Sequence, residues 1–238
     1  MKGFIYGLGL QWKMDIRSKS MLIACYLVPL LFFVFVGGVF TSTNPESKYT
    51  LIQSMSIMGV IMGGVIGLPP SLVEVYGGDV KKVYKANGVP IFLEFLIHSL
   101  SAFIHLLIMC TIIFVTAPII FDSVIPSNIV VYLLGLGIFI GTTLAMGSAI
   151  GLVIEDTSKV TMASQIIFLP SIMLSGIMFP VEMLPKVLQH FSKIFPATWA
   201  FKAMTSDVFD LSHYIPMLVV FVISILICAY VLLKKIDE

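Results

Sequence analysis

Six long apolar stretches with almost no charge divide the chain, at roughly 21–40, 51–73, 91–121, 129–154, 160–181 and 214–233. The hydrocarbon core of a bilayer is about 30 Å thick, a depth that about 20 helical residues cross. Five of the six stretches hold no ionisable side chain over about that length, apart from Glu at their rims. The pattern therefore predicts an all-α membrane protein with six transmembrane helices in a single domain, 1–238.

The segment before the first stretch, 1–19, is amphipathic. Apolar side chains recur every fourth position while basic residues lie off that stripe: the stripe is Phe4, Leu8, Trp12 and Ile16, and the basic residues are Lys2, Lys13 and Arg17. An apolar face with Trp opposite a basic face is typical of a helix lying along lipid headgroups. We expect an interfacial amphipathic helix; the alternative is a cytoplasmic helix packed on protein.

The positive charges predict an orientation. If the N-terminus is cytoplasmic, four of the 14 Lys and Arg residues face outward and ten face inward; the outer four are Lys48, Lys186, Lys193 and Lys202. Positive residues are enriched on the cytoplasmic side of membrane proteins. Both termini are therefore expected in the cytoplasm, which agrees with an even number of spans.

Composition narrows the function classes. Hydrophobic residues make up 58% of the chain and charged residues 11%, against about 25% charged in soluble domains. The net charge is +1 and the basic residues share no surface, which gives no sign of nucleic-acid binding. The sequence contains no phosphate-binding P-loop, no H-E-x-x-H and no G-x-S-x-G. Its three cysteines lie in apolar runs, and no spacing suggests a metal site.

The third stretch carries the clearest intramembrane polar line. Glu94, His98 and His105 fall on one helical face with Ser101 between them. Ionisable groups inside a membrane are costly and often functional, so one hypothesis is a proton or ion relay. Glu94 lies close to the inner rim, however, which favours a structural interpretation in which it pairs with His98 and anchors the helix.

Methionine and glycine also form helical patterns. The thioethers of Met55, Met58 and Met62 share one face of the second stretch, and Met173 lies on the fifth. Such flexible side chains suit a cleft for varied apolar substrates, and equally suit ordinary packing. Pairs of glycines at G-x-x-x-G spacing (59/63, 137/141 and 147/151) are typical of closely packed membrane helices.

The connection between the second and third stretches is basic and mixed in character. It begins at Pro69-Pro70, which is expected to break or kink the helix, and ends at Pro90. Within 74–90 apolar residues alternate with charged ones; the residues of interest are Glu74, Tyr76, Asp79, Lys81, Lys82 and Tyr84. Two readings stand: a solvated loop that only fixes topology, or a docking surface for a cytoplasmic partner, which the two Tyr favour.

The segment 175–205 contains two helices too short to span a membrane. Pro185 suits the start of the first, whose apolar residues repeat at helical spacing. Pro196 ends it, and a second begins near Thr198 with Trp199 close to its start. Since Trp favours headgroup-level surroundings, both half-helices are expected at the outer interface, dipping into it, within an outer re-entrant segment at 180–212.

This segment resembles the late signature of the membrane subunits of ATP-binding-cassette exporters, the ABC type-2 permease family. The pattern S-G-x-x-F-P, L-P, L-Q-x-x-S, P-x-T is matched at Ser175, Gly176, Phe179, Pro180, Leu184, Pro185, Leu188, Gln189, Ser192, Pro196 and Thr198. The Arg that usually follows an Ala is missing, because Ala203 precedes Met204 and Thr205. The resemblance extends to Glu74, Gly78, Lys81-Lys82 and Pro90, although the usual Thr-Leu-Glu-Arg core is absent.

The resemblance implies that the membrane path and ATP binding belong to different subunits. Two permeases, either two copies of this chain or one copy and a paralogue, would pair with two cytoplasmic ABC ATPases in a bacterial plasma membrane. ATP and Mg²⁺ would bind the ATPases, with no cofactor in this chain. The 74–90 loop would be the coupling element; Gly176, Phe179, Pro180, Pro185, Gln189 and Pro196 would form the outer gate.

The expected function is therefore a permease subunit rather than an enzyme, which exports a hydrophobic or amphipathic substrate by alternating access. The substrate class suggested by the resemblance is a drug, a lipid-like molecule or an antimicrobial peptide. The alternative is a passive channel or a membrane-embedded sensor, but a channel needs polar stripes on several spans. An intramembrane enzyme would have only Glu94, His98 and His105 as candidate catalytic groups.

Overall fold

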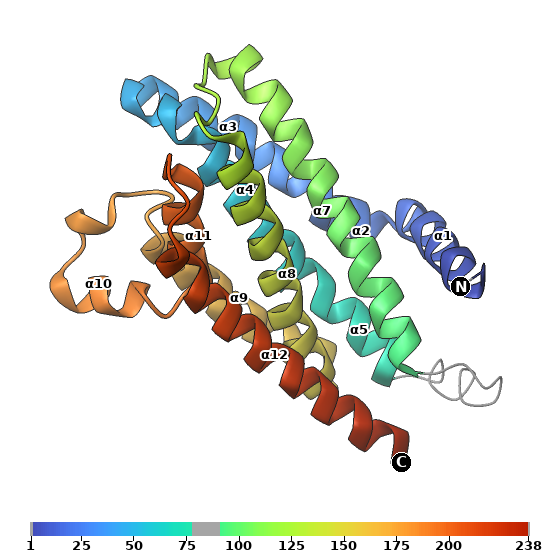
Figure 1. Cartoon of the computed structure of the whole chain (residues 1–238). Helices are drawn as coiled ribbons and strands as arrows, with labels where there is room; N and C mark the ends of the chain where they lie inside the picture. The colour runs from blue at the N-terminus through green and yellow to red at the C-terminus, as the bar shows by residue number, and fades with distance from the viewer. Residues whose placement is uncertain (1, 78–90, 238) are drawn as a thin grey trace.

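A computed structural model describes residues 2–77 and 91–237, which fold into helices joined by short connections (Figure 1). Before the gap, the elements are α1 (Lys2–Arg17), α2 (Lys19–Leu22), the π-helical η1 (Ile23–Leu27), α3 (Val28–Thr43), the 3-10 turn η2 (Pro45–Tyr49), α4 (Leu51–Ile61), the π-helical η3 (Met62–Gly67) and α5 (Leu68–Gly77). After it come α7 (Ile91–Phe121), α8 (Ile129–Val153), α9 (Thr157–Leu174), the 3-10 turn η4 (Val181–Met183), α10 (Lys186–Ser192), α11 (Pro196–Thr205) and α12 (Leu211–Asp237).

Five helical stretches among the described residues are long and apolar enough to cross a membrane: Ile23–Thr43, Leu51–Tyr76, Phe92–Phe121, Ile129–Val153 and Leu211–Lys235. The chain is therefore a membrane-embedded helical protein. The fifth expected span corresponds to α9, which does not reach the same length and apolarity. It has 18 residues, opens on Thr157, Ser158 and Lys159, and holds Pro170 in its interior.

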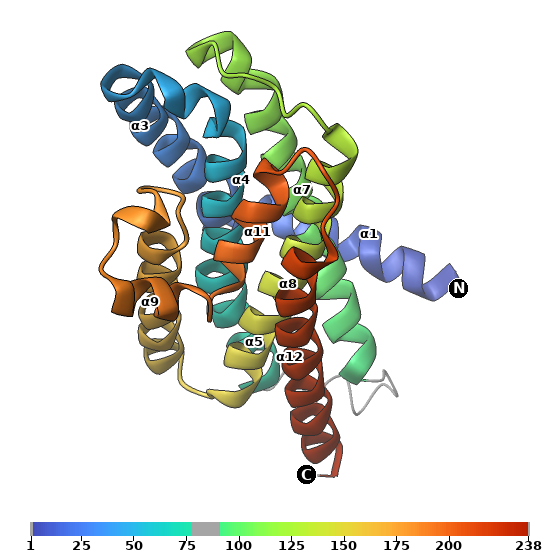
Figure 2. The same cartoon turned by 60° about the vertical axis from the view of Figure 1, so that its left-hand side comes forward.

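The Leu51–Tyr76 stretch forms the centre of the molecule, with α7 and α8 packed against it (Figure 2). Every residue from 51 to 65 is buried, as expected for a helix surrounded by others. Its backbone approaches that of α8 closely at Gly147 and Gly151. A Cβ atom on Gly147 would overlap the carbonyl oxygen of Gly64, and one on Gly151 would lie 2.7 Å from that of Pro69. The glycine spacing at 147/151 thus marks a real helix contact.

The other two glycine pairs differ from each other in what surrounds them. Gly59 and Gly63 face the flexible side chains of Met109 and Leu106 on α7, so they also allow a close helix contact. In contrast, a Cβ atom on Gly137 would meet nothing within 4 Å. The expectation of close packing through a glycine at 137 is wrong for the residues that the structure describes.

The sequence suggested a break or a kink at Pro69-Pro70; the helix does not break there but continues as α5 to Gly77. Proline lacks an amide N–H, so the regular hydrogen-bond ladder is interrupted there. The widened π-turn η3 lies directly before the two prolines, and π-turns are a common site of bends in long helices. Glu74 and Tyr76 therefore lie on a helix rather than in a loop.

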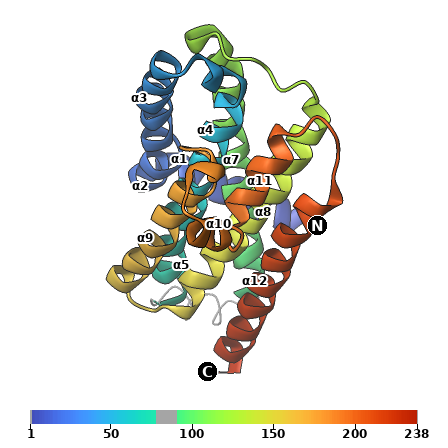
Figure 3. The ribbon, with the colours of Figure 1, turned by 90° about the vertical axis from the view of Figure 1, so that its left-hand side faces the viewer.

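Short connections tie the helices together at the end of the bundle where α3, α4, α8 and α11 meet (Figure 3). The backbone N–H of Val124 donates to the carbonyl of Lys48 at 2.9 Å, and the Lys48 ammonium lies 3.6 Å from the Asp122 carboxylate. The Asn128 amide donates to the carbonyl of Asp207 at 3.1 Å. The ends of α5 and α12 and the start of α7 lie at the opposite end (Figure 1).

Candidate functional site

The segment that follows α9 turns sharply at Gly176. This residue has a φ of +90°, a conformation that side chains other than glycine rarely adopt. The hydroxyl of Ser175, just before it, donates to the carbonyl of Ile172 at 3.2 Å and closes the end of α9. A Cβ atom at 176 would also lie 3.1 Å from the side chain of Val181. The S-G pair of the signature thus ends one helix and reverses the chain.

Polar side chains of the signature hold the two short helices in place. The Gln189 amide donates to the carbonyls of Leu184 (2.8 Å) and Glu182 (3.3 Å), which fixes α10 to the turn before it. The Thr198 hydroxyl donates to the carbonyl of Ser192 at 2.6 Å. Pro185 precedes α10 and Pro196 starts α11, where a missing N–H costs no helical hydrogen bond. These residues shape the backbone.

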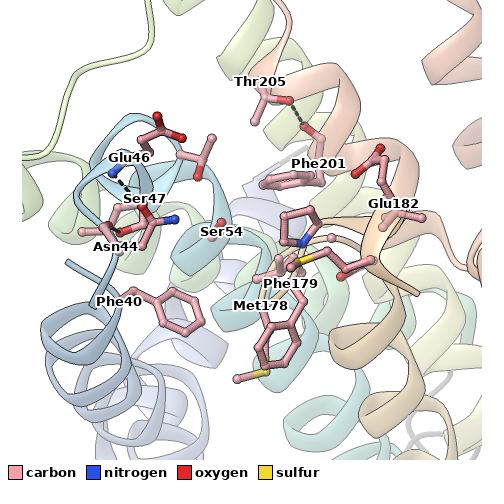
Figure 4. Close-up of a pocket in the computed structure, with 18 of the residues that line it drawn as sticks. Phe40, Asn44, Glu46, Ser47, Ser54, Met178, Phe179, Glu182, Phe201 and Thr205 are labelled. Carbon is pink, nitrogen blue, oxygen red and sulfur yellow. Dashed lines mark hydrogen bonds between the residues drawn. The ribbon is translucent and has the colours of Figure 1, made fainter. Parts of the chain in front are cut away.

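The reversed segment closes one side of a pocket of about 640 Å³, which we call the signature pocket (Figure 4). Its other side is formed by the end of α3, η2 and the start of α4. Aromatic and thioether side chains line it from both sides: Phe40, Met178, Phe179, Met183 and Phe201. Ser54, almost fully buried, lies at its base on α4. The pocket offers an apolar interior of drug size.

Charged groups stand around the apolar interior. Glu46 on η2 and Glu182 on η4 both line the signature pocket, and Lys202 on α11 is the lining cation. The Lys202 ammonium lies 5.2 Å from the centroid of the Trp199 ring, a cation–π contact. Trp199 in turn donates its indole N–H to the carbonyl of Lys193 at 2.7 Å. An apolar pocket with a charged rim suits an amphipathic molecule.

A second polar site lies between α1 and α7, where Asp15 is buried at 5% exposure. One carboxylate oxygen accepts a hydrogen bond from the Gln11 amide (2.8 Å) and the other from the Ser101 hydroxyl (2.5 Å). The His105 ring nitrogen Nε2 lies 3.7 Å from the second oxygen. These contacts fasten α1 to the face of α7 that carries the histidines, and we call them the Asp15 cluster.

The two histidines of the Asp15 cluster are held from other helices. His98 Nδ1 lies 3.0 Å from the Gln11 amide, and its Nε2 lies 2.9 Å from the Ser71 hydroxyl on α5. His105 Nδ1 lies 2.7 Å from the Tyr26 hydroxyl on η1, while the Trp12 ring stacks on the imidazole at a centroid distance of 4.1 Å. The cluster therefore joins α1, η1, α5 and α7.

Sequence reasoning missed most of the Asp15 cluster. It looked for the partner of His98 on the same helix, at Glu94, whereas the two ring nitrogens of His98 contact Gln11 and Ser71. One available signal was that Asp15 is the only acidic residue before Glu46. The other was the spacing of Gln11 and Asp15, four residues apart on one helical face.

The methionines expected at a substrate cleft divide into two groups. Met55, Met58 and Met62 are buried inside this chain, in the central stretch, and do not border the signature pocket. Met173 on α9 is 47% exposed. A substrate would reach the first three only after the helices around the central stretch separate, whereas Met173 is open to lipid or to a partner.

The expected coupling residues are partly described. Glu74 is exposed on α5, and Tyr76, two residues later, is buried at 5% exposure. Asp79, Lys81, Lys82 and Tyr84 lie outside the described residues. The α5 helix that leads to this connection is the one that carries Ser71 and so touches the Asp15 cluster.

Fold and site together define a helical membrane protein with an apolar pocket at one end. The model of the ABC-2 type transporter family matches residues 6–209. The match covers most of the chain, from α1 to the connection before α12, so the chain belongs to this family of transporter membrane domains. No curated protein matches the sequence of this chain. The family assignment makes the chain a transport subunit whose role is generally not catalytic.

Proposed function

We propose that the chain is the permease subunit of an ATP-driven exporter that moves a hydrophobic or amphipathic substrate outward by alternating access. The observation that carries the proposal is the signature pocket: the segment most specific to the family folds back over an apolar cavity with a charged rim. Drugs, lipid-like molecules and antimicrobial peptides all combine the apolar and polar parts that such a lining accommodates.

In the proposed arrangement the chain crosses the membrane six times, with α9 as the short fifth span and both termini in the cytoplasm. The end that holds the signature pocket then faces outward, and α10 and α11 form the re-entrant outer gate. The apolar side chains of Val187, Phe191 and Ile194 are exposed, which supports their contact with lipid or with a second permease. α1 would lie along the inner headgroups, docked through Asp15.

The energy would come from two partner ATPases, which bind ATP and Mg²⁺. A nucleotide shifts a transporter between states only if it binds one state better than the other, so the ATPases must touch the permease. The connection after α5 is the proposed contact, because it joins two of the helices that the Asp15 cluster holds together. A second copy or a paralogue would complete the substrate path, with Met173 near the interface.

A passive channel is less well supported by the packing. The polar line on α7 is closed off by α1, η1 and α5, whose side chains occupy the ring nitrogens of His98 and Nδ1 of His105. A pore needs polar groups that line a continuous path. The polar groups on α7 instead form hydrogen bonds with the side chains of the helices packed against them. The signature pocket also opens at a different place from this cluster.

The coupling assignment predicts the effect of a double substitution. Lys82→Glu with Tyr84→Ala should leave membrane insertion intact while the ATP hydrolysis rate of the assembled complex falls to that of the ATPase alone, because the docking surface is lost. Lys159→Glu, a charge reversal at an exposed position on α9, serves as the matched control. Hydrolysis at the unaltered rate in the double variant would rule out this contact.

A further inference from the structure

A groove separate from the signature pocket runs between α7 and α12, with α8 as its floor. Its volume is about 300 Å³, and α8 lies between the other two helices in Figure 1. The lining is almost entirely apolar, with Phe95, Phe103, Leu144 and Phe221 among its side chains. Because α7, α8 and α12 are all membrane-spanning stretches, this groove opens toward lipid rather than water.

Two hydroxyls in the groove lack a hydrogen-bond partner among the described residues. Ser148 on α8 has no exposure at all, and its Oγ atom is unpaired; the buried Oγ atom of Ser99 on α7 is also unpaired. A buried hydroxyl without a partner is costly, more so where no water is present to satisfy it. The molecule that fills the groove is therefore expected to supply an acceptor.

Neighbouring hydroxyls show that these two differ from their surroundings. In membrane helices a Ser or Thr usually donates to the carbonyl four residues earlier. Thr142 and Thr143 on α8 do so at 2.8 Å, as does Thr111 on α7. Ser99 and Ser148 make no such bond, and both line the groove.

The depth of the two hydroxyls indicates the kind of acceptor. Ser99 follows Glu94 by five residues, and Ser148 precedes Glu155 by seven. At a helical rise of about 1.5 Å per residue, Ser99 lies roughly 7 Å beneath the first carboxylate and Ser148 roughly 10 Å beneath the second. Glu155 is exposed at the bundle end and pairs with Lys235 at 3.1 Å, as expected at headgroup level. Just beneath lipid headgroups lie ester carbonyls, and beneath these the acyl chains.

We propose that this groove binds one acyl chain of a glycerolipid, and that the hydroxyls of Ser99 and Ser148 donate hydrogen bonds to its ester carbonyl. The groove continues past the serines to Phe103 on α7 and Gly141 on α8, about 6 Å beyond Ser99 and about 10 Å beyond Ser148 by the same helical rise. Since one leaflet is about half of the 30 Å hydrocarbon core, the groove encloses the upper part of the acyl chain, next to the ester. The ester fixes the lipid in depth, and the aromatic side chains enclose its chain.

The test uses the full chain purified in detergent and a phosphatidylglycerol with a diazirine midway along one acyl chain. After irradiation, peptide mapping should place the label on α7, α8 and α12. Unlabelled dioleoyl ester lipid should compete about fivefold or more better than the ether-linked lipid with the same chains, since a hydrogen bond contributes on the order of fivefold in affinity. The ether lipid lacks the carbonyl acceptor.

Substitutions within the groove test two claims separately: that the hydroxyls recognise the ester carbonyl, and that the groove holds the acyl chain. Ser99→Ala with Ser148→Ala should abolish the preference for the ester lipid, whereas Ser164→Ala, a buried unpaired hydroxyl outside the groove, should not. Gly141→Leu should fill the groove and reduce labelling by both lipids; Gly137→Leu, where a Cβ atom meets nothing within 4 Å, is its control.

Three results would overturn the proposal. Label that falls outside α7, α8 and α12 would show that the groove is not the site. Equal competition by ester and ether lipids would show that the hydroxyls do not recognise a carbonyl, as would an ester preference that survives the double serine variant. That variant removes only oxygens that have no partner in residues 2–77 and 91–237, so the folded protein is expected to retain its stability.

Discussion

Asp15→Ala is expected to release α1 from α7. The substitution leaves the Gln11 amide and the Ser101 hydroxyl without their shared acceptor and removes the anion beside His105. A buried donor left without its acceptor typically costs about 1–3 kcal/mol. We expect a lower melting temperature of the full chain in detergent.

Cross-linking measures the release of α1 directly. A Cβ atom on Gly7 would lie 2.8 Å from Cδ1 of Ile97, so cysteines at 7 and 97, in a chain whose native cysteines are replaced, should be joined by a short bifunctional thiol cross-linker. Asp15→Ala should reduce that cross-link strongly, and Asp15→Asn less so, because the amide oxygen still accepts one hydrogen bond. Lys13→Ala, an exposed substitution on the same helix, is the control. A cross-link as strong in Asp15→Ala as in Lys13→Ala would contradict the docking role.

Gly147→Leu is expected to disrupt the centre of the bundle. Even a Cβ atom at this position would overlap the carbonyl oxygen of Gly64, and a backbone atom cannot move aside as a flexible side chain can. Overpacking costs about 1–3 kcal/mol and more in severe cases, so we expect little folded protein after purification. Gly137→Leu, on the same helix but with open space around its Cβ position, should purify normally. Equal yields of monodisperse protein would show that α8 and the central stretch are not in such close contact.

The sequence predicted the features that depend on local patterns. Long apolar runs defined the membrane-embedded helices, because nothing else requires 20 such residues in a row. Pro185 marked the start of α10, because proline restricts the backbone in a known way. The expectation that Pro196 ends this helix is wrong, because α10 already ends at Ser192 and Pro196 begins α11. The G-x-x-x-G pair at 147/151 correctly indicated a helix contact.

The features that the sequence did not predict depend on which surfaces meet. In the central stretch every residue from 51 to 65 is buried, and the line of Met55, Met58 and Met62 could not reveal that the other faces of this helix are covered as well. Pro69-Pro70 suggested a break or a kink, and the helix continues through them as α5. Asp15 lies on a helix whose basic and apolar residues drew attention to lipid, and its burial follows only from the contact with α7.

Accessibility of Ser54 provides the most direct test of an ATP-driven outward path through this chain. Ser54 is almost fully buried at the base of the signature pocket, and Ser54→Cys in a chain without its native cysteines can be reacted with a membrane-impermeant thiol reagent from outside. In the complex with its ATPase, we expect at least a roughly tenfold difference in labelling rate between the nucleotide-free and the vanadate-trapped states, since nucleotide must shift the population of outward-open molecules. The same labelling rate in both states of a complex that hydrolyses ATP would contradict the proposed permease function.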